Sequence, residues 1–373
     1  RTQVGQGNNK RPSGEGDMAG SWKGNVSGLV LVMIASSVSG LTPVRPFSFR
    51  DVGRSLGITA PGYDKVASPS IADLNQDGYM DIVVSNHATG PVYVYYGSST
   101  GSFSIVKAFT AKGDRHGTAV GDIDMNGFPD ILLAIGNRGT HPPVRIEYSL
   151  PNGSLVLGQS ETQGFDGLEY LFGARLADLD GDGDLDLFAI GAYDPRQQHI
   201  WRNERLPRRV FVKVQSRLVR PITLPMFNPF ALGFLVFDFN GDGINDILLM
   251  GRGLRLFKGG PTFQFQNVSN MVLPSTYDDR LFNTAAAVDI DNDGDFDLYI
   301  TGGSKLKGSG KSGADLLLEN RNGVFIDISA GSKLPETNCR IGIAAGDFDN
   351  DGFIDLYLPQ VIVGVRPNRA VDI

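Results

Sequence analysis

The sequence predicts an all-β protein built from repeated four-stranded sheets, arranged as the blades of a β-propeller. A nine-residue pattern, D-x-[DN]-x-[DN]-G-x-x-D, occurs six times, starting at Asp73, Asp122, Asp178, Asp238, Asp289 and Asp347. The starts lie 49, 56, 60, 51 and 58 residues apart, so each copy belongs to a unit of similar size. Nothing in residues 41–373 has the length or period of an amphipathic helix. Repeated units of this size with several short strands are typical of propeller blades.

Each unit contains the same four expected strands in the same order. Small and apolar residues precede the pattern, as in "GTAVGD" and "IGIAAGD", and a β-type run such as "DIVVS", "DLFAI" or "DILLM" follows it. A third run comes next in most units ("VYVYYG", "HIWRN", "DLLLEN"), then a fourth that contains Phe ("FVKVQ", "FQFQNV", "VFIDIS"). Short runs bounded by Gly and Asp are typical of strands. Four strands in about 55 residues make one blade.

The number of blades depends on how the ring closes. Phe47–Val52 ("FSFRDV") matches the fourth-strand phrase but precedes the first pattern, whereas the last unit ends without a fourth strand of its own. Closed propellers avoid bare sheet edges, so this N-terminal strand could complete the last of six blades. The other solution is a seventh blade beyond Ile373. We expect seven blades in the full-length protein, with the present chain a fragment of it.

The first 40 residues read as targeting sequence and residues 41–373 as a single propeller domain. From Met18, one Lys is followed by an apolar run, Leu29–Ala35, and by small residues ending at Gly40, which is typical of a signal peptide after an upstream leader. The run is shorter than the roughly 20 apolar residues of a membrane span, although an anchor and a disordered tail stay as alternatives. We expect a secreted or surface-displayed protein with no stable membrane span in the mature chain.

Composition excludes several classes of protein. Lys and Arg number 34 and Asp and Glu 41, and the net charge of −7 argues against a nucleic-acid partner. With a single cysteine, Cys339, the chain is no disulfide-stapled module. The four histidines lie in dissimilar contexts, no G-x-S-x-G is present, and no catalytic constellation is identifiable. Asn152 and Asn267 begin glycosylation sequons, which matter only in a glycosylating cell.

The nine-residue pattern has the chemistry of a calcium loop. Positions 1, 3, 5 and 9 offer side-chain oxygens, Gly at position 6 lets the chain reverse, and position 7 offers a backbone carbonyl. Ca²⁺ takes six to eight oxygen ligands, whereas Zn²⁺ would require His or Cys, which no loop contains. The EF-hand is excluded because the closing acid stands at position 9 instead of 12 and a strand follows. An ordinary turn would not require the ninth residue to be Asp.

We therefore expect up to six Ca²⁺ ions. The predicted ligands, loop by loop, are Asp73, Asn75, Asp77, Tyr79 and Asp81; Asp122, Asp124, Asn126, Phe128 and Asp130; Asp178, Asp180, Asp182, Asp184 and Asp186; Asp238, Asn240, Asp242, Ile244 and Asp246; Asp289, Asp291, Asp293, Asp295 and Asp297; and Asp347, Asp349, Asp351, Phe353 and Asp355. The seventh residue of each loop is expected to bind through its carbonyl. The loops at Asp178, Asp289 and Asp347 have four carboxylates each and should bind most tightly.

The repeats resemble a known family. The loops and their flanks, "FGARLADLDGDGDLDLF" and "GIAAGDFDNDGFIDLYL", are similar to the FG-GAP and VCBS repeats of integrin α-subunit propellers, over roughly residues 47 to 373. The phrases "FIDISAGSKL", "FQNVSNMVL" and "FRDVGRSLGI" are most similar to the cartilage-acidic-protein type. This resemblance implies a seven-bladed propeller, calcium at the blade loops, and adhesion or partner binding. The chain departs from integrins, since it contains no EGF module and no leg domains.

The sequence thus predicts a calcium-binding propeller that acts as an adhesion or ligand-binding module, without enzymatic activity. Its partner would be a protein or glycan, which the longest rim loops, Thr301–Gly313 and Asn137–Pro143, would contact first. The alternative is a propeller that binds or cleaves a polysaccharide with residues scattered around its axis.

Overall fold

The computed structural model describes the strands and most of the loops that connect them. The described residues are 29–32, 52–59, 69–85, 91–110, 115–135, 144–159, 165, 171–191, 198–204, 210–214, 233–303, 314–332, 334, 342–348 and 350–359. The expectation of an all-β fold is confirmed. Helix within these residues amounts to three single turns, η1 (Arg54–Leu56), α1 (Ser269–Val272) and η2 (Ser329–Gly331).

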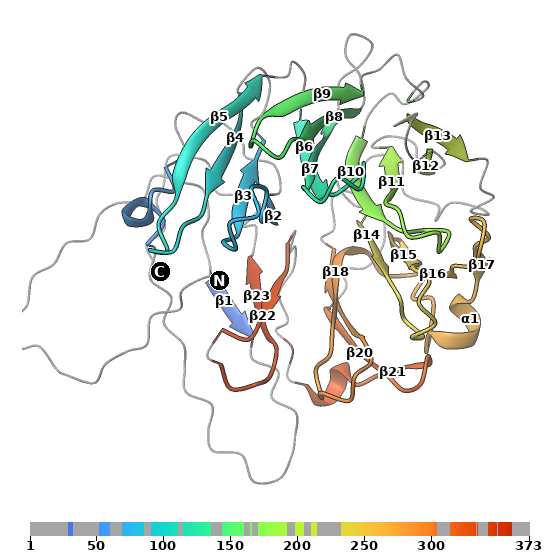
Figure 1. The fold of residues 1–373 in the computed structure, drawn as a ribbon. Coiled ribbons are helices and arrows are strands. Elements are labelled where there is room, and N and C mark those ends of the chain that lie inside the picture. Colours follow the sequence, from blue (N-terminus) through green and yellow to red (C-terminus); the bar gives the residue numbers. More distant parts are fainter. Residues whose placement is uncertain are drawn as a thin grey trace, which may run out of the picture.

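The strands form six antiparallel sheets that follow one another in chain order (Figure 1). Five sheets have four strands, each pairing with the next along the chain, as expected of blades. In chain order these are sheet 1, with β2 (Ser70–Ala72), β3 (Asp81–Val84), β4 (Pro91–Tyr96) and β5 (Ser104–Thr110); sheet 2, with β6 (Arg115–Gly121), β7 (Asp130–Ile135), β8 (Val144–Ser149) and β9 (Leu155–Gln159); sheet 3, with β10 (Leu171–Ala177), β11 (Asp186–Gly191), β12 (Gln198–Glu204) and β13 (Val210–Val214); sheet 4, with β14 (Gly233–Phe237), β15 (Asp246–Gly251), β16 (Gly253–Lys258) and β17 (Gln266–Asn267); and sheet 5, with β18 (Phe282–Val288), β19 (Asp297–Gly302), β20 (Leu316–Asn320) and β21 (Phe325–Asp327). Sheet 6 has three strands, in the order β1 (Leu29–Val32), β23 (Asp355–Pro359) and β22 (Ala344–Gly346).

The hydrophobic core lies between the sheets. Successive side chains of a strand point to opposite faces, so an apolar strand buried on both faces serves two neighbours. In β7, Ile131 and Leu133 pack with sheet 1, whereas Leu132 and Ala134 pack with sheet 3. This explains why the second strand of each unit is apolar throughout instead of alternating.

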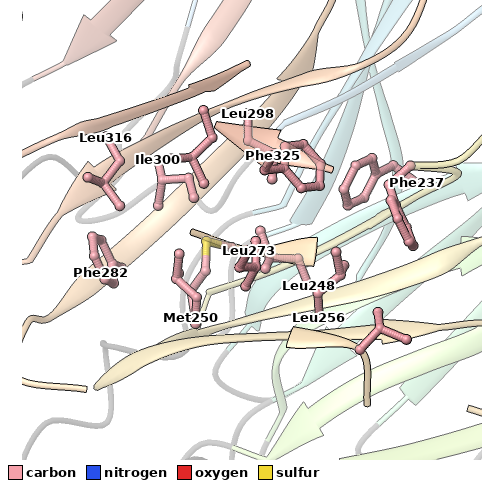
Figure 2. Packing of buried hydrophobic residues seen from close by; sticks show 14 residues of the cluster. Phe237, Leu248, Met250, Leu256, Leu273, Phe282, Leu298, Ile300, Leu316 and Phe325 are labelled. Carbon is pink, nitrogen blue, oxygen red and sulfur yellow. The ribbon is translucent and has the colours of Figure 1, made fainter. Parts of the chain in front are cut away.

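Sheets 4 and 5 show this packing most fully (Figure 2). Leu248 and Met250 of β15 meet Phe282 of β18, Leu298 of β19 and Leu316 of β20 in one buried cluster. Each fully buried side chain of this kind contributes about 1.5–3 kcal/mol. Apolar contacts between neighbouring sheets therefore hold the blades together, while the loops at their ends are left for other chemistry.

Sheet 6 includes a segment that the sequence assigns to the signal peptide. Leu29–Val32 forms β1, which pairs with β23 in antiparallel register, with Val32 opposite Leu356. Cleavage of the leader is not tested by this pairing and stays a prediction. Phe47–Asp51, the expected closing strand, lie outside the described residues, and the number of blades also stays a prediction. In the described part of the chain, no helix is both long and apolar enough to span a membrane.

Candidate metal centres

Every copy of the nine-residue pattern joins two neighbouring strands of its sheet, the first and second in sheets 1 to 5 and β22 and β23 in sheet 6. The residue before position 1 pairs with position 9, as in Phe237 with Asp246 and Val288 with Asp297. In all six sheets, position 9 is the first residue of the strand that follows the loop. The six loops therefore share one frame and lie at the same end of their sheets.

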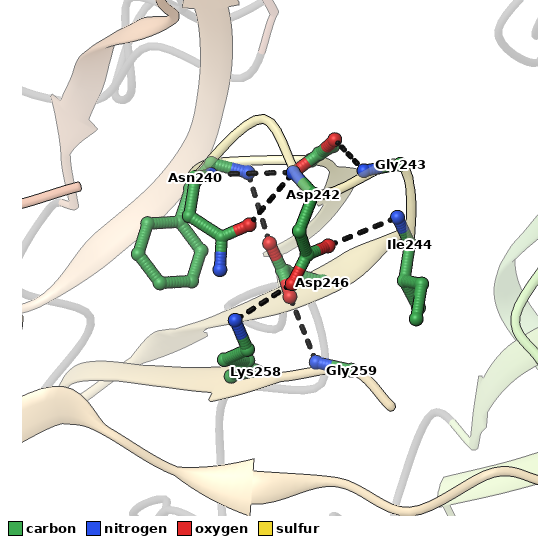
Figure 3. A network of polar contacts seen from close by, with 9 residues as sticks. Asn240, Asp242, Gly243, Ile244, Asp246, Lys258 and Gly259 are labelled. Atoms are coloured by element: carbon green, nitrogen blue, oxygen red, sulfur yellow. Dashed lines mark hydrogen bonds and ion pairs between the residues drawn. The ribbon is translucent and has the colours of Figure 1, made fainter. Parts of the chain in front are cut away.

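The first aspartate of each loop organises the turn through its own carboxylate. In the loop at Asp238, Oδ1 accepts the N–H of Asp242 at 3.2 Å and Oδ2 accepts that of Gly243 at 2.7 Å (Figure 3). The same two bonds recur in all six loops, at 2.9–3.2 Å and 2.7–3.1 Å. Gly243 has φ +83, a left-handed conformation that strongly favours glycine. These bonds orient the carboxylate before any ion binds.

The ninth aspartate attaches the loop to the rest of its blade. Asp246 is fully buried; its Oδ2 accepts the N–H of Phe239 at 2.9 Å and its Oδ1 that of Gly259 at 2.7 Å, where the third strand ends. Both bonds recur at Asp81, Asp130, Asp186 and Asp297. This residue, expected only as a closing ligand, therefore also ties three strands of the blade together.

The buried carboxylates are poised to attract positive charge. Burial raises the pKa of Asp130, Asp186 and Asp297 to about 7, against the hydrogen bonds that lower it, and neighbouring loop acids raise it further. Burial likewise raises the pKa of Asp246 to about 6. Because each of these groups is destabilised as an anion, a cation bound beside it would be stabilising.

Among the described residues, three loops bring acidic oxygens together tightly enough to hold a metal ion. Positions 1, 3 and 9 supply one carboxylate oxygen each, and the three oxygens lie within 4.8 Å of one another. The groups are Asp122, Asp124 and Asp130; Asp178, Asp180 and Asp186; and Asp289, Asp291 and Asp297. Oδ1 of Asp180 is buried and accepts no hydrogen bond from the described residues. Hard oxygen donors with a spare buried acceptor fit Ca²⁺.

The remaining predicted ligands are placed differently. Asp182 and Asp293, at position 5, fall outside these groups, and each accepts the N–H of position 7 through Oδ1. Position 3 is an amide, Asn75 or Asn240, in the loops of sheets 1 and 4, and Asp349 lies outside the described residues. The geometry therefore identifies three loops as acidic clusters. Two of them, at Asp178 and Asp289, are also among the loops whose four carboxylates predict the tightest calcium binding.

A lysine, missed by the sequence analysis, occupies the loop of sheet 4. Lys258 Nζ donates to Asp242 Oδ2 at 2.6 Å (Figure 3). Burial, the largest influence, raises the pKa of Asp242, but hydrogen bonds from Lys258 and the Ile244 N–H, together with the lysine charge, leave that pKa below its ordinary value. This ammonium group competes with any metal ion for the same carboxylate.

Asparagines, also missed by the sequence analysis, link the loops of neighbouring sheets. Nδ2 of Asn203 donates to Ile123 O, and Nδ2 of Asn320 to Phe239 O, both at 2.8 Å. The accepting carbonyls belong to position 2 of the loop in the preceding sheet. Asn245 Nδ2 likewise donates to Asp178 O at 2.9 Å. Asn203 and Asn320 follow position 9 by 17 and 23 residues, so no fixed spacing marks them in the sequence.

The sheets and their acidic loops define a β-propeller, and comparison with known proteins gives its repeat class. The model of the FG-GAP-like repeat matches residues 73–133, 178–249 and 238–300. The chain is therefore an FG-GAP-like repeat β-propeller. The integrin-like and cartilage-acidic-protein features of the resemblance stay predictions. No curated protein is significantly similar to the chain in sequence.

The structure is similar to solved structures of other proteins, and for the lectin below the similarity extends to the fold. An Agrocybe aegerita lectin, described in terms of specific recognition of non-reducing terminal N-acetylglucosamine, is 20% identical, with a TM-score of 0.54 over 78% of this chain and 73% of the lectin. The Bacillus licheniformis rhamnogalacturonan lyase PL11 is 12% identical, with a TM-score of 0.40 over 79% of this chain and 55% of the lyase. At 20% identity, the likeness to the lectin concerns the fold alone.

Proposed function

We propose that this protein is a secreted or cell-surface β-propeller that binds calcium in its hairpin loops and acts as an adhesion or ligand-binding module. The observation that supports calcium most directly is the convergence of carboxylates from positions 1, 3 and 9, with the ninth buried at the start of the second strand. Such a cluster without a cation concentrates negative charge in a desolvated place, which is unfavourable.

Calcium would be held by Asp178, Asp180 and Asp186 in sheet 3, and by the matching residues of sheets 2 and 5. The ion supplies positive charge that neutralises the buried carboxylates. Asp186 also accepts hydrogen bonds from the N–H groups of Leu179 and Asn203. A bound ion that keeps Asp186 ionised and in place would therefore stabilise the connection between the loop and the third strand. In this proposal calcium is structural, and the rest of the molecule binds the ligand.

A glycan is the ligand class that we propose to test first, with a protein as the second. A lectin shares this fold, and propeller rims present variable loops on a rigid scaffold. The second candidate function is cleavage of a polysaccharide, which in most glycoside hydrolases requires two carboxyl groups flanking the bound sugar. The acid triplets found within the described residues all lie in the proposed calcium loops, and the test below measures binding and cleavage together.

The test is a screen of the purified protein, with 1 mM Ca²⁺ and with EDTA, against arrayed glycans and candidate surface proteins. Saturable binding without new reducing ends supports the ligand-binding module. Release of sugar fragments would instead support the polysaccharide-cleaving enzyme. Secretion is tested separately: N-terminal sequencing of protein from its native source should begin near Leu41, and recovery of Met18 on a soluble cytosolic protein would contradict it.

A further inference from the structure

A second polar feature lies at the outer edge of sheet 4, away from the acidic loops. There the short strand β17 gives way to α1, and a segment from Leu273 to Leu281 leads to sheet 5. Between them is a cavity of about 230 Å³, lined chiefly by Arg255, Asn267, Asn270, Met271, Thr276 and Asp278. The hairpin at Gly251–Gly253 borders it, at the end of the sheet opposite the acidic loop.

The walls of this cleft are fixed by hydrogen bonds. Leu254 N–H donates to Thr276 O at 2.8 Å and Gly253 N–H to Arg280 O at 2.9 Å, which fastens the segment to the hairpin. Gly253 has φ +86, and a Cβ there would lie 2.6 Å from Asp278 Oδ1. A larger residue would therefore push the segment away. The cleft is preformed, so the protein loses little conformational entropy when a ligand binds.

The groups that line the cleft suit a neutral, hydroxyl-rich ligand. Arg255 Nη2 pairs with Asp278 Oδ1 at 2.7 Å, so the two charges largely cancel. Among the described residues, no hydrogen bond occupies the amide of Asn270 or the hydroxyl of Thr276, and both can donate as well as accept. Met271, whose surface is 72% exposed, adds an apolar surface beside them.

We propose that this cleft binds one neutral pyranose residue, such as N-acetylglucosamine, of a larger glycan. Sugar hydroxyls donate and accept at once, and a carboxylate, an amide and a hydroxyl on rigid walls can satisfy them in pairs. A uronic or sialic acid is disfavoured because Arg255, the cation among the lining residues, is already paired with Asp278 and would have to leave it to bind the acid. This inference rests on the proposed glycan-binding function and assigns that function to a place in the fold.

The experiment uses the full chain made without glycosylation, so that the sequon at Asn267 carries no sugar. N-acetylglucosamine, its trimer, galactose and glucuronic acid are titrated by calorimetry in 1 mM Ca²⁺. We expect a neutral sugar to bind, with about tenfold weaker binding for Asp278→Asn and about three- to tenfold weaker binding for Thr276→Val and Asn270→Ala. Gln264→Ala, an exposed change in the Pro261–Phe265 turn of the same sheet, should leave binding unchanged. Equal melting temperatures would show that the variants fold.

The outcomes separate the two proposals. If all three cleft variants bind the neutral sugar as tightly as the parent protein, the assignment of binding to this cleft is wrong, while the proposed glycan-binding function stands. If none of these sugars binds and no glycan on the array binds either, both the cleft assignment and the glycan-binding function are wrong. Glucuronic acid binding as tightly as the neutral sugars overturns the assignment of ligand charge. Loss of binding in the cleft variants alone supports the inference.

Discussion

At the scale of the residue, the first and ninth aspartates of each loop have a structural task besides their expected metal contact. Asp178 caps three N–H groups of its own turn, and Asp186 caps two more from the loop and the third strand. Oδ2 of Asp178 and both oxygens of Asp186 each accept one of these hydrogen bonds, which leaves each of them a second lone pair for a cation. Position 3 is different: Oδ1 of Asp180 is buried and no described residue donates to it. Substitutions at position 3 therefore test metal affinity with the least damage to the fold.

The number of carboxylates should set the order of calcium affinities. Asp180→Asn and Asp291→Asn each remove one charge but keep an oxygen, so calorimetric titration should show about tenfold weaker calcium binding in that loop. Asn75→Asp adds a charge and should strengthen binding in sheet 1 by a similar factor. Calcium affinities unchanged from those of the parent protein in all three variants would show that loop geometry, and not the number of carboxylates, sets the order of affinities.

Lys258 should weaken calcium binding in the loop of sheet 4. Lys258→Met keeps the length of the side chain and removes the ammonium group from Asp242. Since exposed ion pairs contribute up to about 1 kcal/mol, we expect calcium affinity there to rise about two- to fivefold. Lys213→Met, a change on β13 of sheet 3, serves as the control and should alter no loop of sheet 4. An unchanged affinity in the Lys258 variant would show that the lysine moves aside freely.

At the scale of the element, a blade is a four-stranded sheet whose acidic loop is tied to the next blade by an amide. Asn320 of β20 donates to Phe239 O and to Phe296 O, at 2.8 and 3.1 Å. The first carbonyl belongs to the loop of sheet 4 and the second to that of sheet 5. One fully buried side chain thus fixes the spacing between two candidate metal centres.

Removing this amide should destabilise the protein and loosen the sheet 4 loop. Asn320→Ala leaves two carbonyls without their donor, which costs about 1–3 kcal/mol. Denaturant unfolding measures this loss, and calcium titration should also show weaker binding in the loop at Asp238. Gln264→Ala, an exposed change in the same sheet, should alter neither quantity. If stability falls but calcium binding does not change, the amide acts only in packing.

At the scale of the whole molecule, charge balance links calcium to stability. Six Ca²⁺ ions would add 12 charges and change the net charge from −7 to +5. The apolar clusters between the sheets do not depend on ions. Chelation should therefore lower the melting temperature without dissolving the fold.

The effect of chelation should grow with pH. In EDTA, burial holds the pKa of Asp130, Asp186 and Asp297 at about 7, above the ordinary 3.8. The stability that these groups contribute in their protonated form is therefore fully present below about pH 3.8 and is lost as pH rises through about 7. Calcium binds the ionised form. With 1 mM Ca²⁺ and a Kd of about 0.1 mM, each site would add about 1.4 kcal/mol at pH 8. The gap between melting temperatures in Ca²⁺ and EDTA should widen from pH 5 to pH 8, and a constant gap would contradict this.

The sequence by itself determined the repeat, the strand order and the acidic positions, because each depends on neighbours within one unit. Hydrophobic runs bounded by Gly and Asp specify strands locally, and the loop from Asp178 to Asp186 closes on itself through short-range bonds. Only the tertiary structure decided the second role of position 9, the lysine on Asp242, the link from Asn320 and the cleft at Asp278. These contacts join residues at variable separations, up to 81 residues for Asn320 and Phe239, and no local pattern encodes a distance that the stacking of sheets sets.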